Sequence, residues 1–275
     1  AGGVLNARDA RRRAATDELI DRVALEEFDA AHGKPELAPI AVVIAAYKEA
    51  ANIANVMAGM PKQVADLDAS VVVVVDGEDD GTGAIVRESG HYACIAPVNR
   101  GQGAALRLGY RVAREHGARY IVTADADGQT DPDDLATVIG PVVAGELDFV
   151  NGSRRLGRTE SKDAMRNAGV LFFGKLVSLL TATRVTDTAN PIRAMRADVS
   201  GRLTLEEPQY QASELLISAI MHGYRFGERP VTMLARKEGA SKKGGNFSYG
   251  YRYGRVLMRT WLRERARVKQ ELASG

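Results

Sequence analysis

The chain has 275 residues and is 45% hydrophobic, enough to bury a large core as one domain with or without an appendage. Its formal net charge of +2 gives no global excess of positive charge that would call for a nucleic acid partner. The single cysteine, Cys94, lies in an apolar run, so it predicts a small buried hydrophobic residue and excludes a disulfide framework. No apolar stretch approaches the about 20 residues that cross a bilayer, and no secretory-type segment is seen, so we expect a cytoplasmic protein.

The N-terminal part predicts one long helix, and the region after it predicts a layered α/β domain. Residues 7–32 place large apolar residues at helical spacing among Ala, Arg and Glu, which indicates an amphipathic helix outside the main domain. From residue 39, apolar runs typical of buried strands alternate with helical patterns, which favours a doubly wound, mostly parallel sheet. We expect strands at residues 40–46, 70–75, 92–96, 120–124 and 147–150, and helices at residues 50–60, 103–116 and 132–143 and from residue 83.

Residues 251–272 form a basic segment whose pattern predicts an amphipathic helix. Trp261 and several aliphatic residues tend to one side of it, and arginines dominate its charges. Helices of this kind lie on anionic membrane surfaces, or they pack their apolar side on the parent domain or a second subunit. Because no lipid anchor or spanning helix accompanies it, we favour packing on the domain.

Two aspartates directly follow the predicted strand at residues 120–124. If the chain stays extended, Asp125 and Asp127 point the same way, because side chains alternate along a strand. Two converging carboxylates repel unless a cation lies between them, and Mg²⁺ or Mn²⁺ suits such hard oxygen ligands. A polar turn is the alternative interpretation.

Unusual polar and glycine-rich sequences follow the other predicted strands as well. Since ligands of doubly wound sheets bind beyond the carboxyl ends of the strands, their gathering at one edge favours a nucleotide site over ordinary turns. The segments are Ala46 to Glu49, Asp76 to Gly81, Asn99 to Gly103 and Asp125 to Asp127.

Five motifs, in this order, carry a resemblance to a known family: residues 42–49, 75–82, 99–105, 125–129 and 152–154. Together they resemble the family 2 glycosyltransferases, which have the GT-A fold, a Rossmann-like, mostly parallel sheet flanked by helices. Residues 186–194 and 236–242 are most similar to the dolichyl- or polyprenyl-phosphate sugar transferases. The resemblance implies a glycosyltransferase domain over residues 39–245, with helical extensions over residues 1–38 and 246–275.

The resemblance implies a donor site for a nucleotide-diphospho-sugar and a divalent metal. Asp127 would hold Mg²⁺ or Mn²⁺, and Asp125 would support the metal or the donor ribose. Asp76 would accept a hydrogen bond from a ring N–H of uracil or guanine, because an ionised carboxylate only accepts. The remaining donor residues would be Ala46, Tyr47, Glu49, Gly101, Gln102 and Gly103.

On the acceptor side, the sequence departs from the family pattern. Many members carry a Glu-Asp pair where this chain has Gln211 and Ala212, and neither residue accepts a proton. A hydroxyl acceptor would therefore require Asp187 or Glu214 as base, whereas a phosphate acceptor is already anionic. Ordinary alternatives are a loop cap for Asp187 and a helix N-terminal charge for Glu214.

These observations predict an inverting, metal-dependent glycosyltransferase that acts on a phosphorylated polyprenyl-type carrier lipid, with peripheral contact at the inner membrane face. Alternatives are a soluble enzyme that glycosylates a hydroxyl of a small molecule, a nucleotidyltransferase and a non-catalytic binding module. The acceptor phosphate would be bound by Arg154, Arg193, Arg236, Ser241 and Lys242.

Overall fold

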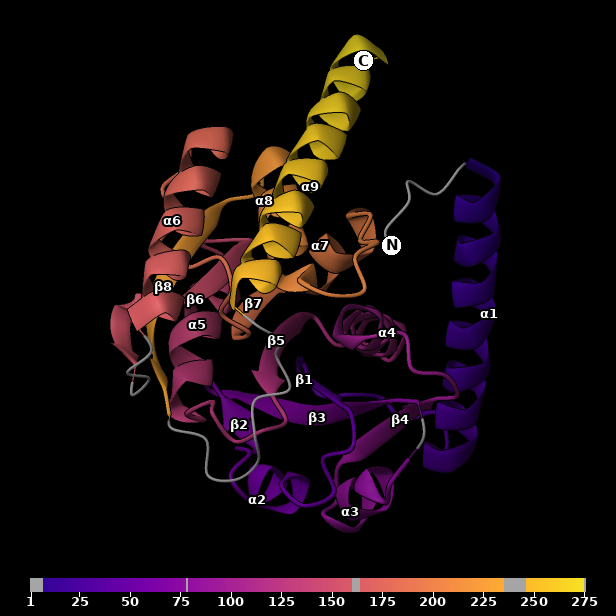
Figure 1. Ribbon diagram of the computed structural model, residues 1–275. Helices are drawn as coiled ribbons and strands as arrows, with labels where there is room; N and C mark the ends of the chain where they lie inside the picture. Colours follow the sequence, from indigo (N-terminus) through magenta and orange to yellow (C-terminus); the bar gives the residue numbers. More distant parts are fainter. Residues whose placement is uncertain (1–6, 78, 160–163, 235–245, 275) are drawn as a thin grey trace.

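The computed structural model describes residues 7–77, 79–159, 164–234 and 246–274 (Figure 1). Its strands are β1 (Ile40–Ala46), β2 (Gln63–Val64), β3 (Leu67–Asp76), β4 (Tyr92–Ala96), β5 (Tyr120–Asp125), β6 (Phe149–Thr159), β7 (Arg193–Arg196) and β8 (Phe226–Met233). Its helices are α1 (Ala7–His32), α2 (Ile53–Ala58), α3 (Thr82–Glu88), α4 (Gln102–Glu115), α5 (Asp133–Val143), α6 (Ala164–Thr181), α7 (Ala197–Arg202), α8 (Gln211–Met221) and α9 (Asn246–Ser274).

The strands form one mixed sheet in which the parallel pairs predominate. Strands β4, β3, β1 and β5 lie side by side in parallel, as the sequence predicts. Strand β7 then runs antiparallel between β5 and β6, and β8 pairs in parallel with β6. The sheet thus combines the predicted parallel half with a second half built around one antiparallel strand.

The centre of the sheet is buried on both faces, and β3 shows why. Five consecutive valines, residues 71–75, are almost fully buried in it. Because side chains alternate along a strand, Val72 and Val74 join the core beneath α1, α4 and α8, while Val71 and Val73 join the core beneath α2 and α5. A continuous β-branched run therefore suits this strand better than an alternating one.

Helix α1 packs against the edge of the sheet rather than standing apart from it (Figure 1). Its Ala24, Leu25 and Phe28 are buried in the core that also contains Cys94 of β4. The thiol is fully buried, and burial raises its pKa to about 12. The predicted helix at residues 7–32 and the buried cysteine are thus both confirmed, and the helix also covers an otherwise exposed edge strand.

At the other end, α9 packs one side on α8 and α6, as favoured from the sequence. Tyr253, Val256, Leu257 and Glu264 of this side are buried. Within the described ranges, no helix is both long enough and apolar enough to cross a membrane.

Candidate functional site

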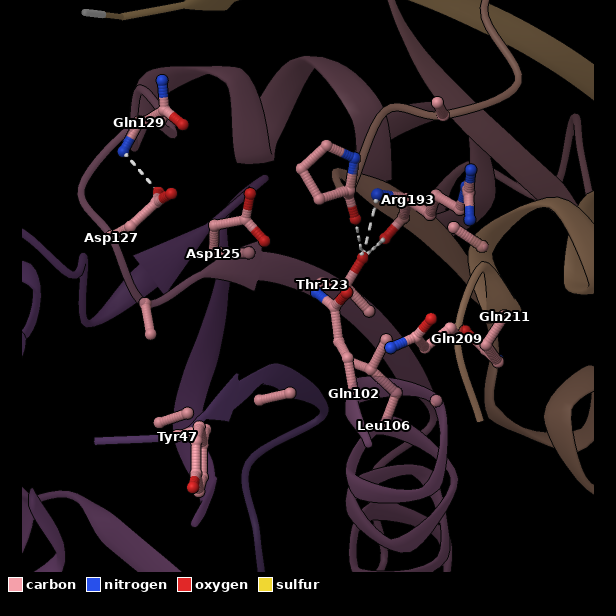
Figure 2. Close-up of a pocket in the computed structure, with 18 of the residues that line it drawn as sticks. Tyr47, Gln102, Leu106, Thr123, Asp125, Asp127, Gln129, Arg193, Gln209 and Gln211 are labelled. Carbon is pink, nitrogen blue, oxygen red and sulfur yellow. Dashed lines mark hydrogen bonds between the residues drawn. The ribbon is translucent and has the colours of Figure 1, made fainter. Parts of the chain in front are cut away.

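A cavity of about 630 Å³ opens at the carboxyl ends of β1, β3 and β5, bounded by α4, β7 and the start of α8. Figure 2 shows Asp125 and Asp127 on one side of it and Arg193, Gln209 and Gln211 on the other. Predicted site residues that line this cavity are Ala46, Tyr47, Glu49, Asp76, Gln102, Gly103, Asp125, Asp127, Arg154 and Arg193. We call the side with Asp76, Asp125 and Asp127 the carboxylate side, and the side with Arg154, Arg193, Gln209 and Gln211 the cationic side.

On the carboxylate side, Asp125 ends β5 and Asp127 lies in the turn that follows. The turn is held by hydrogen bonds from the Asp125 backbone N–H to Thr130 Oγ1 (3.2 Å) and from the Gln129 N–H to Asp127 Oδ1 (3.2 Å). The described residues contain no cluster of three His, Cys, Asp or Glu residues for a metal. Two carboxylates completed by the oxygens of a substrate diphosphate nevertheless suit Mg²⁺ or Mn²⁺, which rarely occupies an all-protein cage.

Asp76, also on the carboxylate side, fixes the loop that carries the glycine motif. Its Oδ1 accepts the backbone N–H of Arg100 (3.0 Å) and its Oδ2 that of Gly101 (2.7 Å). The Arg100 guanidinium in turn pairs with Asp17 and Asp21 of α1. Asp76 therefore positions the loop while it lines the cavity, a role that the sequence did not indicate.

The glycines of that loop are required by a neighbouring segment of the chain. Gly101 has a φ of 95°, in the left-handed region that favours glycine. A Cβ on Gly103 would lie 2.1 Å from the carbonyl oxygen of Glu207. The Gly103 N–H donates to the carbonyl of Pro208 (2.9 Å). Because these glycines lack side chains, the segment just before α8 can pack against the loop, and this places the cationic side of the cavity. Gly101 is predicted to bind the donor, but it does not line the cavity.

On the cationic side, Arg154 forms a bidentate ion pair with Asp187. Arg154 Nε donates to Asp187 Oδ2 (2.7 Å) and Nη2 to Oδ1 (2.8 Å). Burial alone would raise the pKa of Asp187, but the hydrogen bonds and charge of Arg154 outweigh it and hold the pKa below its ordinary value. Asp187 is fully buried and does not line the cavity. It is therefore poorly placed to accept a proton from a substrate.

Glu214, the other candidate base, is also fully buried and outside the cavity lining. Its two oxygens accept the backbone N–H groups of Glu206 (2.8 Å) and Glu207 (2.9 Å). Its Oε1 also pairs with Arg263 of α9 at 2.8 Å. The structure thus gives Glu214 the task of holding the segment before α8 and tying it to α9.

Arg193 is the most unusual residue of the cavity, because its buried guanidinium donates hydrogen bonds only to neutral groups. Its side chain donates to Asn151 Oδ1 (2.9 Å) and to the carbonyl of Thr188 (3.0 Å). It forms no ion pair with a carboxylate in the described part of the chain, since nearby Asp187 is held by Arg154. Burial lowers its pKa to about 10, so the guanidinium remains charged at neutral pH. A buried cation of this kind calls for an anionic ligand.

Gln211 begins α8 on the same side of the cavity as Arg193, and from the sequence it stands out only as the residue that replaces an acidic one. It is buried, lines the cavity, and its amide oxygen and nitrogen make no hydrogen bond with any described residue. Gln209 and Tyr210, which precede it, also line the cavity, and no sequence motif marks them. The predicted acceptor residues Arg236, Ser241 and Lys242 lie outside the described residues.

The fold has a GT-A-like architecture with a cavity at its strand ends, and comparison with known proteins shows that the chain is a nucleotide-sugar glycosyltransferase. Residues 41–203, more than half of the chain, match the model of glycosyl transferase family 2. The chain belongs to this family, and it is a family 2 glycosyltransferase enzyme.

Two characterised relatives resemble the chain over most of its length. A UDP-N-acetylglucosamine–dolichyl-phosphate N-acetylglucosaminyltransferase of Methanococcus voltae is 31% identical over 242 residues, which cover 80% of this chain and 95% of that protein. A dolichyl-phosphate hexose transferase of Haloferax volcanii is 30% identical over 229 residues, 83% of this chain and 96% of that protein. The resemblance to the dolichyl- and polyprenyl-phosphate sugar transferases is thereby confirmed.

Among solved structures, glucosyl-3-phosphoglycerate synthase from Mycobacterium tuberculosis shares the fold. It superposes with a TM-score of 0.64 at 20% identity, covering 87% of this chain and 83% of that one. That crystal structure holds Mn²⁺, UDP and glucosyl-3-phosphoglycerate. The likeness confirms the predicted α/β architecture with helices at both termini.

Proposed function

We propose that this enzyme transfers a sugar from a nucleotide-diphospho-sugar to the phosphate of a polyprenyl-type carrier lipid, with inversion at the anomeric carbon. The observation that carries the proposal is the charge of Arg193, which is buried on the cationic side of the cavity without an ion pair to any described carboxylate. Gln211 lines the same side, so this side offers hydrogen-bond donors to an anion. Relatives named for transfer to dolichyl phosphate support the same acceptor class.

The use of the carboxylates supports a phosphate acceptor over a hydroxyl acceptor. Among the described residues, the carboxylates that line the cavity are Glu49, Asp76, Asp125 and Asp127, and all belong to strand ends β1, β3 and β5. Asp187 and Glu214 are held in ion pairs outside the cavity. The second pKa of a phosphate monoester is about 6, so its oxygen is nucleophilic at neutral pH without a base. On the cationic side, a hydroxyl acceptor would lack a described carboxylate that could take its proton.

In the proposed reaction, an acceptor phosphate oxygen attacks the anomeric carbon as the bond to the nucleotide diphosphate breaks. Asp125 and Asp127 would hold Mg²⁺ or Mn²⁺, which neutralises charge on the departing diphosphate. Asp76 keeps the glycine loop in place beneath the nucleotide, and Arg193 orients the acceptor phosphate. The bound divalent metal of the fold relative supports this assignment of the carboxylate side.

The test is a matched pair of acceptors that differ only in the phosphate. A short-chain prenyl phosphate and the corresponding prenol are incubated with UDP- and GDP-sugars, and nucleotide release and product mass are measured. We expect transfer to the phosphate and none to the alcohol. Transfer to the prenol, or to another hydroxyl compound in preference, would overturn the proposal.

A further inference from the structure

The outward face of α6 is apolar where a helix in water would be polar. Its exposed described positions are Ala168, Leu171, Phe172, Lys175 and Leu179, and their spacing of one, three or four residues places them on one face. Phe172 is 63% exposed and Leu179 is 81% exposed. The described part of α6 contains no acidic residue. The helix is therefore apolar both toward the core and away from it.

Helix α9 exposes a similar row. Tyr251, Met258 and Leu262 are spaced by seven and four residues, and Leu262 is 57% exposed. The opposite side of the same helix is buried against α8, as Leu257 and Thr260 show. These three residues thus remain exposed to solvent although the helix packs on the domain.

The two rows form one surface, because α6 and α9 lie side by side and run in the same direction (Figure 1). The rings of Phe173 and Tyr253 are in edge contact at 4.8 Å between centroids. Two turns further on, Trp261 Nε1 donates to the carbonyl of Leu180 (2.8 Å). We call the surface the α6–α9 face, with Leu171, Phe172, Leu179, Tyr251, Met258 and Leu262 as its apolar residues.

Basic side chains accompany these apolar residues. Lys175, Arg255, Arg265 and Lys269 are exposed at helical spacing from them, and Arg265 stacks on Trp261 at 5.0 Å. A second copy of the chain on a two-fold axis would bring the same basic surface against itself, at an electrostatic cost. An anionic surface with an apolar interior complements both kinds of residue at once.

Aromatic side chains behind the α6–α9 face connect its two helices to the cavity. Tyr253 contacts the ring of Tyr210 at 5.3 Å between centroids, and Tyr210 lines the cavity. Phe173 of α6 also contacts the ring of Tyr253. A continuous row of aromatic rings therefore joins α6 to the cationic side.

We propose that the α6–α9 face docks on an anionic lipid bilayer, with its apolar side chains in the headgroup–acyl boundary and its Lys and Arg residues on lipid phosphates. The proposal rests on the proposed function, because docking there would bring the cavity beside the phosphate of an embedded carrier lipid. It assigns the lipid contact to α6 as well as to the basic C-terminal helix.

The test measures co-sedimentation with vesicles of phosphatidylcholine and phosphatidylglycerol, and with vesicles of phosphatidylcholine alone. We expect binding to the anionic vesicles, weakened at least about tenfold in Phe172→Ser/Leu179→Ser and in Lys175→Glu/Arg255→Glu. Leu19→Ser is the matched control and should bind normally, because Leu19 is a 50% exposed apolar residue on α1, outside the α6–α9 face. The proposal would be overturned if all variants bound the vesicles equally, or if the wild type did not bind anionic vesicles. It would also be overturned if the wild type formed a dimer that only the Phe172→Ser/Leu179→Ser variant lost.

A second readout separates this inference from the proposed function. The docking variants should keep wild-type turnover with the short-chain prenyl phosphate in the absence of vesicles, and lose it with vesicle-embedded polyprenyl phosphate. Transfer to the short-chain acceptor without vesicle binding would refute docking alone. Vesicle binding without transfer to either acceptor would refute the proposed function alone.

Discussion

The two sides of the cavity use their acidic residues in opposite ways. On the carboxylate side, Asp125 and Asp127 line the cavity at the end of a parallel strand. On the cationic side, Asp187 and Glu214 are buried in pairs with Arg154 and Arg263 and do not reach the cavity. The difference teaches that the partner of a carboxylate, rather than its presence in a motif, decides whether it binds ligand or holds structure.

The largest effect should come from removing the proposed metal ligand of the carboxylate side. Asp127→Ala should lower turnover on the order of 1,000-fold, because charge on the departing diphosphate loses its counter-ion. Nucleotide release at saturating donor measures it. Asp133→Asn, an exposed aspartate at the start of α5, is the control and should be near wild type. The metal role would be refuted if UDP or GDP raised the thermal stability of the protein equally with and without Mn²⁺, and equally in Asp127→Ala and the wild type.

Breaking the ion pair of the cationic side should instead cost stability. Asp187→Asn leaves the Arg154 charge buried without a counter-ion, so the free energy of unfolding should fall by about 3–5 kcal/mol. Urea unfolding measures this change. Asp198→Asn, which breaks a half-exposed pair with Arg196, should cost less than about 1 kcal/mol. Equal losses in the two variants would show that the buried pair has no special weight.

The same pair predicts a pH dependence. Because the pKa of Asp187 is lower in the folded chain, its contribution is complete above the unfolded pKa of about 4 and is lost as the pH falls through the folded value. Below about pH 4, the stability of the wild type should therefore fall more steeply than that of Asp187→Asn. Parallel curves for the two proteins would contradict the shift.

A smaller change sharpens the contrast by moving a carboxylate to the cationic side. Gln211→Glu should raise the KM for a phosphate acceptor about 30-fold through like-charge repulsion, and leave nucleotide binding unchanged. Gln211→Met, neutral and of similar length, separates the charge from the lost amide. Steady-state kinetics with varied acceptor measures both. Faster transfer to a hydroxyl acceptor in Gln211→Glu would indicate that a base was the missing group.

The smallest effect concerns the contact between the two sides. Gly103→Ala should lower the free energy of unfolding by about 1–3 kcal/mol, because its Cβ would displace the carbonyl of Glu207. Gly140→Ala, in α5 with no atom near its Cβ, should raise it by up to about 1 kcal/mol. Thermal unfolding compares them, and equal values would refute the packing constraint.

The sequence predicts the parallel half of the fold well, and the other half poorly. Strand β3 is a run of five valines, and its pairing neighbours are similarly apolar. Strands β7 and β8 contain Arg193, Arg196, Arg229 and Pro230, so neither alternation nor an apolar run marks them. Helix α6 follows a strand that continues to Thr159, well past its apolar start. These elements form because partners distant in the chain cover them.

The same distinction explains the site. Asp125, Asp127 and the glycine loop are predictable, because their positions follow directly from the ends of strands. Asp187 and Arg154 lie 33 residues apart in the chain, and Glu214 and Arg263 lie 49 apart. No local spacing reports such pairs. From the sequence, Asp187 and Glu214 are therefore both candidate bases. Only the structure shows that each is paired with an arginine.

Helix α1 contributes to the cavity region from outside the recognisable motifs. A chain cut at residue 39 would retain every glycosyltransferase motif, but it would lose Asp17 and Asp21, the counter-ions of Arg100. Since the adjoining backbone of Arg100 and Gly101 is held by Asp76, the cut should loosen the loop that we propose to lie beneath the nucleotide. The residues that hold this loop in place thus extend beyond the recognisable motifs.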